Sequence, residues 1–444
     1  MSEAIILRGV RPLGGDPRDV VVMDGRIASI EPAGTGAAPA GASSVREATL
    51  DGKVLLPGLV DLHTHLREPG REDAETVLTG TRAAALGGFT AVHAMANTSP
   101  VADNAAVVEQ VWHTGREAGY CDVRPVGAVS VNLAGERLAE LGAMADSPAA
   151  VRVFSDDGHC VFDAAIMRRA LEYVKAFDGV VAQHAQDPQL TAKAQMNEGI
   201  VSAQLGLTGW PAVAEEAVVA RDILLTAHVG SRLHVCHVST AGTVDLLRRA
   251  KERGVDVTAE VTPHHLLLTE DLVRGYDPLF KVNPPLRTAD DVAALRQGLA
   301  DGIIDAVATD HAPHPVEDKE GEWDSSAFGM LGLQSALSIV VETMVKPGLI
   351  DWSGLADRMS RIPAMIGRVG DQGRPIAVGE PANLTVVDPD AQWTVRGSQL
   401  ASKSRNTPFE GMTLPGVVVA TVYGGRPTVW DGQLVAGPTG VAVR

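Results

Sequence analysis

The sequence predicts a mixed α/β fold: a (β/α)8 TIM-like barrel with a small β-sandwich domain formed by both ends of the chain. Two observations lead to this prediction. The middle of the chain alternates short apolar runs with helix-length segments, which is typical of parallel βαβ units. Both ends instead carry short strand-like runs separated by Gly-containing turns. We therefore expect a discontinuous β domain of residues 1–56 plus 376–444 and a metal-dependent hydrolase barrel of residues 57–375.

The strand-like runs at the two ends turn in the same way. The dipeptides Asp24-Gly25 and Asp431-Gly432 each lie between β-rich runs, which is a hairpin signal. The Ala/Gly/Pro-rich stretch Pro32–Ala42 is expected to be a surface loop. Because both ends share this pattern, we expect them to pair. The expected strands are Ala4–Arg8, Asp19–Met23, Arg26–Ile30, Asn383–Asp388, Val417–Tyr423 and Thr428–Asp431.

Eight apolar runs in the middle of the chain are the expected barrel strands. They are Gly58–His63, Thr90–Ala96, Asp122–Ser130, Val151–Phe154, Gly179–His184, Arg232–His237, Val255–Val261 and Ile303–Thr309. Helical patterning lies between them, for example at Ala74–Leu86, Ala164–Lys175 and Thr243–Arg253. In such a barrel the active site lies at the C-terminal ends of the strands.

Composition narrows the class of partner. The chain has 444 residues, of which 45% are apolar, and a formal net charge of -17. No basic excess is available to neutralise phosphates, so we expect a small-molecule substrate and neither nucleic acid nor an anionic membrane as partner. Three unevenly spaced cysteines, with no apolar stretch of about 20 residues and no signal peptide, lead us to expect a cytoplasmic protein.

Polar residues that are able to do chemistry follow the expected strands. Scattered core histidines would have no reason to gather at strand ends, so this placement favours an active site. The residues are His63, His65, Asn97, Asp156, Asp157, His184, His237 and Asp310.

The histidines and Asp310 suit two divalent metal ions. His63 and His65 are two apart on a strand, so their side chains point to the same side. An isolated His-x-His pair is a weak signal, but His184, His237 and Asp310 end three further runs. Two neighbouring ions need a bridging anion. Ligands of imidazole and carboxylate without thiolate favour zinc, with manganese or cobalt as substitutes.

The fourth run, Val151–Phe154, leads into two adjacent aspartates and contains Arg152 but no lysine. A carboxylate bridges two ions with its two oxygens and stays charged at neutral pH. Asp156 or Asp157 is therefore the expected bridge, and the residue pattern does not choose between them.

Seven stretches together resemble the dihydroorotases of the amidohydrolase superfamily, and this resemblance covers nearly the whole chain. The stretches are residues 56–70, 96–100, 154–158, 237–240, 261–266, 283–287 and 308–314. Many amidohydrolases bridge their metals with a carboxylated lysine. Ser-Asp-Asp-Gly at 155–158 instead resembles the type in which an aspartate is the bridge, and Asp157 best matches that aspartate.

The resemblance implies a role for each matching residue. One metal would be bound by His63, His65 and Asp310, the other by His184 and His237, with Asp157 between them. Two features depart from the family: Ala96 stands where proline is usual, and Ala-Gln-Asp follows His184 where an acidic run is common. The implied substrate contacts are Arg67, Asn97 and His314 for the carboxylate, Asn283, and the backbone of Phe328 and Gly329.

The implied reaction is the reversible cyclisation of N-carbamoyl-L-aspartate to L-dihydroorotate and water, a step of de novo pyrimidine biosynthesis. A hydroxide shared by the metals would attack the ring amide, and Asp310 would act as general acid and base. The polar segment Pro315–Ala327 is either a lid or a solvated loop.

Two other functions remain as alternatives. A hydantoinase or allantoinase shares the fold and metals, but those enzymes resemble the lysine-bridged type. Arg67 also favours a substrate with a carboxylate. A catalytically silent homologue that scaffolds aspartate transcarbamoylase would be expected to lose metal ligands, whereas every ligand position here is filled. A homodimer is the default expectation for the protein alone, and a complex with that transcarbamoylase stays open as an alternative.

Overall fold

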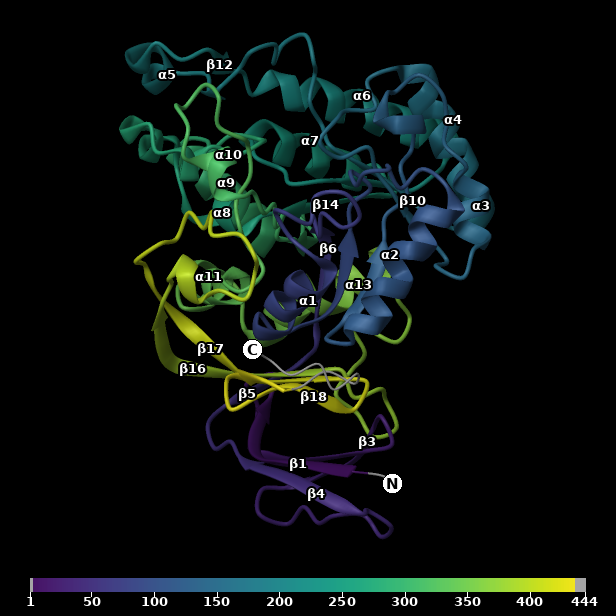
Figure 1. The fold of residues 1–444 in the computed structure, drawn as a ribbon, viewed down its shortest axis with the longest axis vertical. Coiled ribbons are helices and arrows are strands. Elements are labelled where there is room, and N and C mark those ends of the chain that lie inside the picture. Colours follow the sequence, from purple (N-terminus) through teal and green to yellow (C-terminus); the bar gives the residue numbers. More distant parts are fainter. Residues whose placement is uncertain (1–2, 436–444) are drawn as a thin grey trace.

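Both ends of the chain build one β-sheet, which lies at the bottom of Figure 1, in a computed structural model that describes residues 3–435. The two parts join where β16 runs antiparallel to β5, with Leu384 opposite Pro57 and Val387 opposite Val54. The strands are β1 (Glu3–Pro12), β2 (Arg18–Met23), β3 (Arg26–Pro32), β4 (Ser44–Thr49), β5 (Val54–Pro57), β16 (Leu384–Thr394), β17 (Thr413–Tyr423), β18 (Arg426–Trp430) and β19 (Gln433–Leu434).

The predicted pairing of the two ends is confirmed. Strands β4 and β5 were not predicted, and β4 in particular alternates exposed and half-buried positions with little apolar content. The domain has an apolar core of its own, to which both ends contribute, including Ile5, Leu7, Leu384 and Val386. The last part of the expected β domain, residues 436–444, lies outside the described residues.

The barrel strands coincide with the eight predicted apolar runs. They are β6 (Leu59–Thr64), β7 (Phe89–Ala94), β8 (Asp122–Pro125), β9 (Val153–Phe154), β10 (Val180–Gln183), β13 (Leu233–Val235), β14 (Val257–Val261) and β15 (Ala306–Val307). Strands β6, β7 and β8 form one parallel sheet, and β9, β10, β13, β14 and β15 form another. Parallel bridges between Gly127 and Phe154 and between Thr64 and His311 join the two sheets, so the barrel closes.

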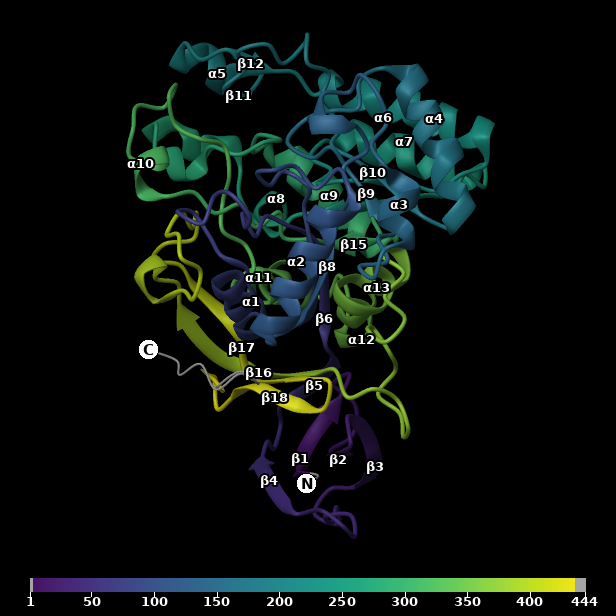
Figure 2. The same cartoon turned by 45° about the vertical axis from the view of Figure 1, so that its right-hand side comes forward.

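Helices cover the outside of the barrel (Figures 1 and 2). Asp163 caps α4 by accepting hydrogen bonds from the backbone of Ala165 and Ile166, and the helix then buries one apolar face. The main helices are α1 (Val77–Leu86), α2 (Ala105–Ala118), α3 (Leu141–Asp146), α4 (Ala164–Val174), α6 (Val213–Val229), α7 (Ala241–Glu252), α9 (Ala289–Ala300), α11 (Ala336–Val340), α12 (Trp352–Ala356) and α13 (Ile362–Ile366).

Short elements and loops surround the C-terminal ends of the barrel strands. The segment between β16 and β17 rises from the β domain beside α11 (Figure 1). There Ser402 bonds to Glu75, and Asn406 bonds to Ala312 and Gly329. The other elements are β11 (Met196–Asn197), α5 (Ile200–Leu205), β12 (Gly209–Trp210), α8 (Pro263–Leu267) and α10 (Val316–Lys319).

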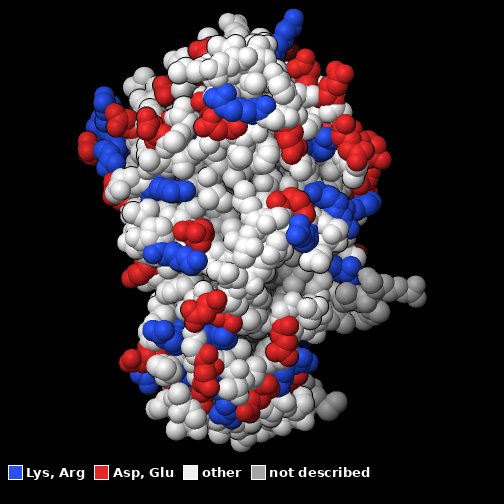
Figure 3. All heavy atoms as spheres, turned by 90° about the vertical axis from the view of Figure 1, so that its left-hand side faces the viewer, with Lys and Arg blue, Asp and Glu red and all other residues white. Residues whose placement is uncertain are grey.

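On the face shown in Figure 3, acidic and basic side chains are interspersed. Within residues 3–435, no helix has both the length and the apolar character needed to cross a bilayer.

Candidate metal centre

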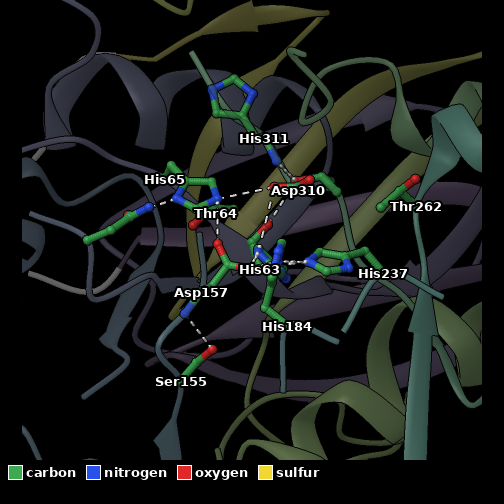
Figure 4. Close-up of polar contacts among 12 residues, drawn as sticks. His63, Thr64, His65, Ser155, Asp157, His184, His237, Thr262, Asp310 and His311 are labelled. Carbon is green, nitrogen blue, oxygen red and sulfur yellow. Dashed lines mark hydrogen bonds and ion pairs between the residues drawn. The ribbon is translucent and has the colours of Figure 1, made fainter. Parts of the chain in front are cut away.

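The side chains predicted as metal ligands converge at the C-terminal ends of the barrel strands (Figure 4). They come from five strands that are far apart in the sequence, and each is at most 6% exposed. His63 and His65 come from the end of β6, Asp157 follows β9, His184 follows β10, His237 follows β13, and Asp310 follows β15.

Asp157 lies at the middle of this cluster. Its Oδ1 is 3.3 Å from His63 Nε2, 3.1 Å from His184 Nδ1 and 3.2 Å from His237 Nε2. Its Oδ2 is 3.3 Å from His65 Nε2. Asp310 Oδ1 lies on the His63 and His65 side, 3.1 Å from His65 Nε2 and 3.6 Å from His63 Nε2. The carboxylate of Asp157 is thus shared between two groups of imidazoles.

The donor atoms fit two divalent ions. The potential ligand atoms of His63, His65 and Asp157 lie within 4.8 Å of one another, and so do those of Asp157, His184 and His237. His63 Nε2 is buried and makes no hydrogen bond with any residue of the range 3–435, although it points into the cluster. A buried nitrogen without a partner is costly unless something binds it. Imidazole and carboxylate donors are those that zinc accepts.

The two carboxylates are ionised. Burial alone would raise the pKa of Asp157, but the charge of His63 and the hydrogen bonds from His184 and His237 outweigh it and hold the pKa well below its usual range. The pKa of Asp310 is lowered in the same way, because the hydrogen bond from His65 and the charge of His63 outweigh burial. The cluster therefore offers anionic oxygens at neutral pH.

Asp156, the other aspartate that the sequence left open as the bridge, faces away from the cluster. Its Oδ1 accepts hydrogen bonds from the backbone of Val129 at 2.8 Å and Ser130 at 2.9 Å, and its Oδ2 accepts one from the Ser130 hydroxyl. These three donors fix the carboxylate against the turn after β8. Asp157 is the aspartate available to metal ions.

The outer nitrogens of three imidazoles have different partners. His63 Nδ1 is 2.7 Å from Glu260 Oε1, His65 Nδ1 is 2.9 Å from Asn97 Oδ1, and His184 Nε2 is 2.7 Å from Gln186 Oε1. Glu260 and Gln186 were missed in the sequence. A charged residue inside the apolar run Val255–Val261 was the available signal for Glu260, because a buried carboxylate needs partners.

Three residues of the site have a left-handed backbone, namely Arg67 with φ 63°, His237 with φ 32° and Asp310 with φ 45°. This conformation is uncommon for residues other than glycine and is concentrated at functional sites. Each of the three lies two or three residues after the end of a barrel strand, where the chain turns at the barrel mouth.

The predicted carboxylate-binding residues lie together. Arg67 Nε donates to Pro313 O at 3.1 Å, and its Nη2 is 3.5 Å from His314 Nε2. Burial and the charge of Arg67 lower the pKa of His314 to about 3, so His314 is neutral. Its Nε2–H donates to Phe328 O at 2.8 Å. A Cβ on Gly329 would lie 2.7 Å from His314 Nε2, so this close approach requires glycine.

Asn283 reaches the centre through Gln186, the partner of His184. Its Nδ2 donates to Gln186 Oε1 at 3.0 Å, while its Oδ1 is buried without a hydrogen-bond partner in the described part of the chain. Asn97 contacts His65 through Oδ1. The structure therefore brings every predicted substrate residue to the barrel mouth.

Asn406 and Lys319 also hold this mouth, and the sequence singled out neither. Asn406 accepts from His314 N at 3.1 Å and donates to Ala312 O at 3.0 Å and Gly329 O at 3.2 Å. Lys319 Nζ donates to Ala327 O at 2.8 Å and to Gly329 O at 3.1 Å. The segment Pro315–Ala327, which was expected to be a lid or a loop, is anchored by these bonds, and whether it moves stays a prediction.

Comparison with known proteins shows which family the chain belongs to. Residues 52–243 match the dihydro-orotase-like family. Over 434 residues the chain is 66% identical to the dihydroorotase of Streptomyces coelicolor, covering 98% of this chain and 100% of that protein. It is 58% identical, with the same coverage, to the dihydroorotase of Mycobacterium tuberculosis. The chain belongs to the dihydroorotase family.

Solved structures similar in fold to this dihydroorotase include a hydantoinase and a dihydropyrimidinase. An L-hydantoinase (dihydropyrimidinase) from Arthrobacter aurescens superposes with a TM-score of 0.85 at 26% identity, over 98% of this chain and 97% of that one. A dihydropyrimidinase from Brevibacillus agri gives 0.82 at 24%, over 99% and 97%. The dihydroorotase thus has the amidohydrolase fold of a barrel with a β-sandwich from the termini, as the sequence predicted.

Proposed function

We propose that this dihydroorotase catalyses the reversible cyclisation of N-carbamoyl-L-aspartate to L-dihydroorotate and water, in de novo synthesis of UMP. The observation that carries the proposal is the placement of Asp157 between two pairs of imidazoles, with Arg67 and His314 at the same barrel mouth. A metal cluster beside a guanidinium suits an amide substrate that also bears a carboxylate.

Two divalent ions, which we expect to be zinc, would be held by His63, His65 and Asp310 on one side and by His184 and His237 on the other, with Asp157 shared. Bound there, they would supply Lewis acidity toward the amide carbonyl and lower the pKa of water.

Asp310 is the proposed proton carrier. In ring opening, a water oxygen forms a bond to the ring amide carbon, and the bond from that carbon to the ring nitrogen breaks. Asp310, ionised at neutral pH, accepts the proton of the water and delivers it to the departing nitrogen. Ring closure reverses these steps, with the proton moving from the carbamoyl nitrogen to Asp310 and then to the departing oxygen.

Arg67 is the proposed anchor of the substrate carboxylate. Burial lowers its pKa to about 10, so it stays protonated at neutral pH. A guanidinium binds a carboxylate through two parallel hydrogen bonds and so fixes its orientation. His314, by turning its Nε2–H from Phe328 O to the substrate, and the amides of Asn97 and Asn283 would complete the contacts, together with the backbone of Phe328 and Gly329. Hydantoin carries no carboxylate to use this anchor.

The test is turnover by the zinc-loaded protein of L-dihydroorotate, with hydantoin and allantoin as parallel substrates. We expect ring opening of dihydroorotate alone, lost in Asp310→Ala. Turnover of hydantoin or allantoin instead would contradict the role of Arg67. Absence of turnover with two metals bound would favour the silent scaffold, and aspartate transcarbamoylase would then be added.

Three further features belong to this proposal. The domain division into residues 1–56 with 376–444 and residues 57–375 would be tested by limited proteolysis. A homodimer and a complex with aspartate transcarbamoylase would be tested by light scattering of the protein alone and mixed with the transcarbamoylase. The metal would be identified by elemental analysis.

A further inference from the structure

A series of buried, hydrogen-bonded side chains lies behind His63 inside the barrel. Glu260, on β14, reaches His63 on β6 with Oε1 at 2.7 Å from Nδ1. Its Oε2 is 2.9 Å from His234 Nε2, and His234 Nδ1 is 2.9 Å from the Thr258 hydroxyl. His63, Glu260 and His234 are each at most 1% exposed. Both oxygens of the carboxylate are thus held by imidazoles.

This series of hydrogen-bonded side chains determines which nitrogen of His63 faces the cluster. Because a carboxylate only accepts hydrogen bonds, Nδ1 of His63 keeps a proton, and Nε2 is the nitrogen that gives up its proton and offers a lone pair when a metal ion binds. Nε2 is the nitrogen that lies 3.3 Å from Asp157 and has no hydrogen-bond partner among residues 3–435. His234 holds the second oxygen, so Glu260 keeps its orientation.

In the other half of the centre, the outer nitrogen of His184 meets a neutral side chain where that of His63 meets Glu260. His184 presents Nδ1 to Asp157, and its Nε2 meets the amide oxygen of Gln186 at 2.7 Å. Gln186 is itself held by Asn283 and Thr191. Each imidazole thus has its outer nitrogen bound to a side-chain oxygen, but that oxygen belongs to a carboxylate behind His63 and to a neutral amide behind His184.

We propose that Glu260 is a positioning residue that makes the His63, His65 and Asp310 half of the centre the tighter metal site, whereas neutral Gln186 keeps the His184 and His237 half weaker. The inference rests on the proposed two-metal centre. An ionised partner raises the basicity of an imidazole ligand and adds attraction for the cation. Asp310 belongs to the same half, so two negative charges besides the shared Asp157 favour it.

The test is a metal titration of the metal-free protein, with zinc competing against a chromophoric chelator, followed by cobalt to observe each site by absorbance. We expect two ions to bind in two separate steps in the unmodified protein. Glu260→Gln keeps the shape and an acceptor for His63 but removes the charge, so the first step should weaken by about 10–100-fold while the second is unchanged. Gln186→Glu should strengthen the second step.

Two more variants make the titration specific. Glu270→Gln removes the charge of another buried glutamate, which accepts from Asn197 and touches none of the ligands, so it should leave both steps unchanged. His234→Gln releases the far end of Glu260 and should weaken the first step by a smaller factor than Glu260→Gln. It also keeps the test open if Glu260→Gln does not fold.

The possible failures are distinguishable. If fewer than two ions bind, the proposed function fails first. If two ions bind but the titration curve of Glu260→Gln matches that of the unmodified protein, or both steps weaken equally, the inference is wrong. The proposed two-metal centre is then still supported. Cys236 lies with His63 and Glu260 in a group whose ligand atoms are within 4.8 Å of one another. Uptake of a third ion, lost in both Cys236→Ser and Glu260→Gln, would make Glu260 a ligand and would also overturn the inference.

Discussion

Asn406 ties the substrate-binding loops together, and its removal gives a prediction whose size follows from the contacts. Asn406→Ala leaves Ala312 O and His314 N without their side-chain partners. Gly329 O keeps its bond from Lys319. Each unsatisfied backbone group costs about 1–3 kcal/mol. A cavity of about 320 Å³ beside Asn406 and His314 admits water, so we expect the lower end, about 2 kcal/mol in total.

This loss is expected to be local and to reach the active site through His314. The amide hydrogen of His314 should exchange with solvent about 30-fold faster, which corresponds to about 2 kcal/mol of local opening. Because His314 and Gly329 are in close contact, displacement of one moves the other. We expect kcat/KM for dihydroorotate to fall by about 10–100-fold, mainly through KM.

Asn104→Ala is the matched control. Asn104 caps α2 by accepting hydrogen bonds from the backbone of Ala106 and Val107, and it makes no hydrogen bond to the residues that Asn406 holds. Its removal should cost about 1 kcal/mol of stability without any change in KM. An Asn406→Ala protein with unchanged KM and unchanged exchange at His314, or an equal change of KM in both variants, would refute the reasoning.

Three further predictions concern other parts of the site. Asp310→Ala should lower kcat by about 10²–10⁴-fold, whereas a metal titration should still show an ion at His184 and His237; retained turnover would exclude Asp310 as proton carrier. Glu75 accepts hydrogen bonds from Ser402 and Lys403, so Glu75→Gln should lower the stability to urea by about 2 kcal/mol, and an unchanged midpoint would contradict this. Burial and the charge of Lys281 lower the pKa of Lys319 to about 7 from 10.5. The unfolded chain therefore binds more protons between these values, and stability should rise with pH from 7 toward 10. The melting temperature of the unmodified protein should therefore rise relative to that of Lys319→Met from pH 7 to 8 to 9. A constant offset between the two proteins would refute the role of Lys319.

The barrel strands and the cluster residues were predictable because both depend on local sequence. An apolar run of strand length followed by a histidine or aspartate places that residue at the barrel mouth once the fold is known. His63, His65, His184, His237 and Asp310 all satisfy this rule. The strand β4 was not predictable in this way, because its side chains are largely exposed and its residues lack apolar alternation.

The residues that hold the cluster in place could not be predicted, because their partners are distant in sequence. Glu260 is 197 residues from His63, and Asn406 is 92 residues from His314. Nothing in the residues around Asn406 indicates a contact with the barrel. Its position depends on how the segment between β16 and β17 returns to the mouth, which is a property of the whole fold.

The choice between Asp156 and Asp157 could not be predicted from local sequence either, although the two residues are adjacent. Both follow β9 and both have the same chemistry, so the local pattern treats them equally. The distinction comes from Val129 and Ser130, which lie 27 and 26 residues before Asp156 and whose backbone N–H groups bind its carboxylate. These hydrogen bonds hold the Asp156 carboxylate against the turn after β8, away from the imidazoles. Once the turn after β8 has bound Asp156, the next residue points to the opposite side, and Asp157 enters the cluster of imidazoles.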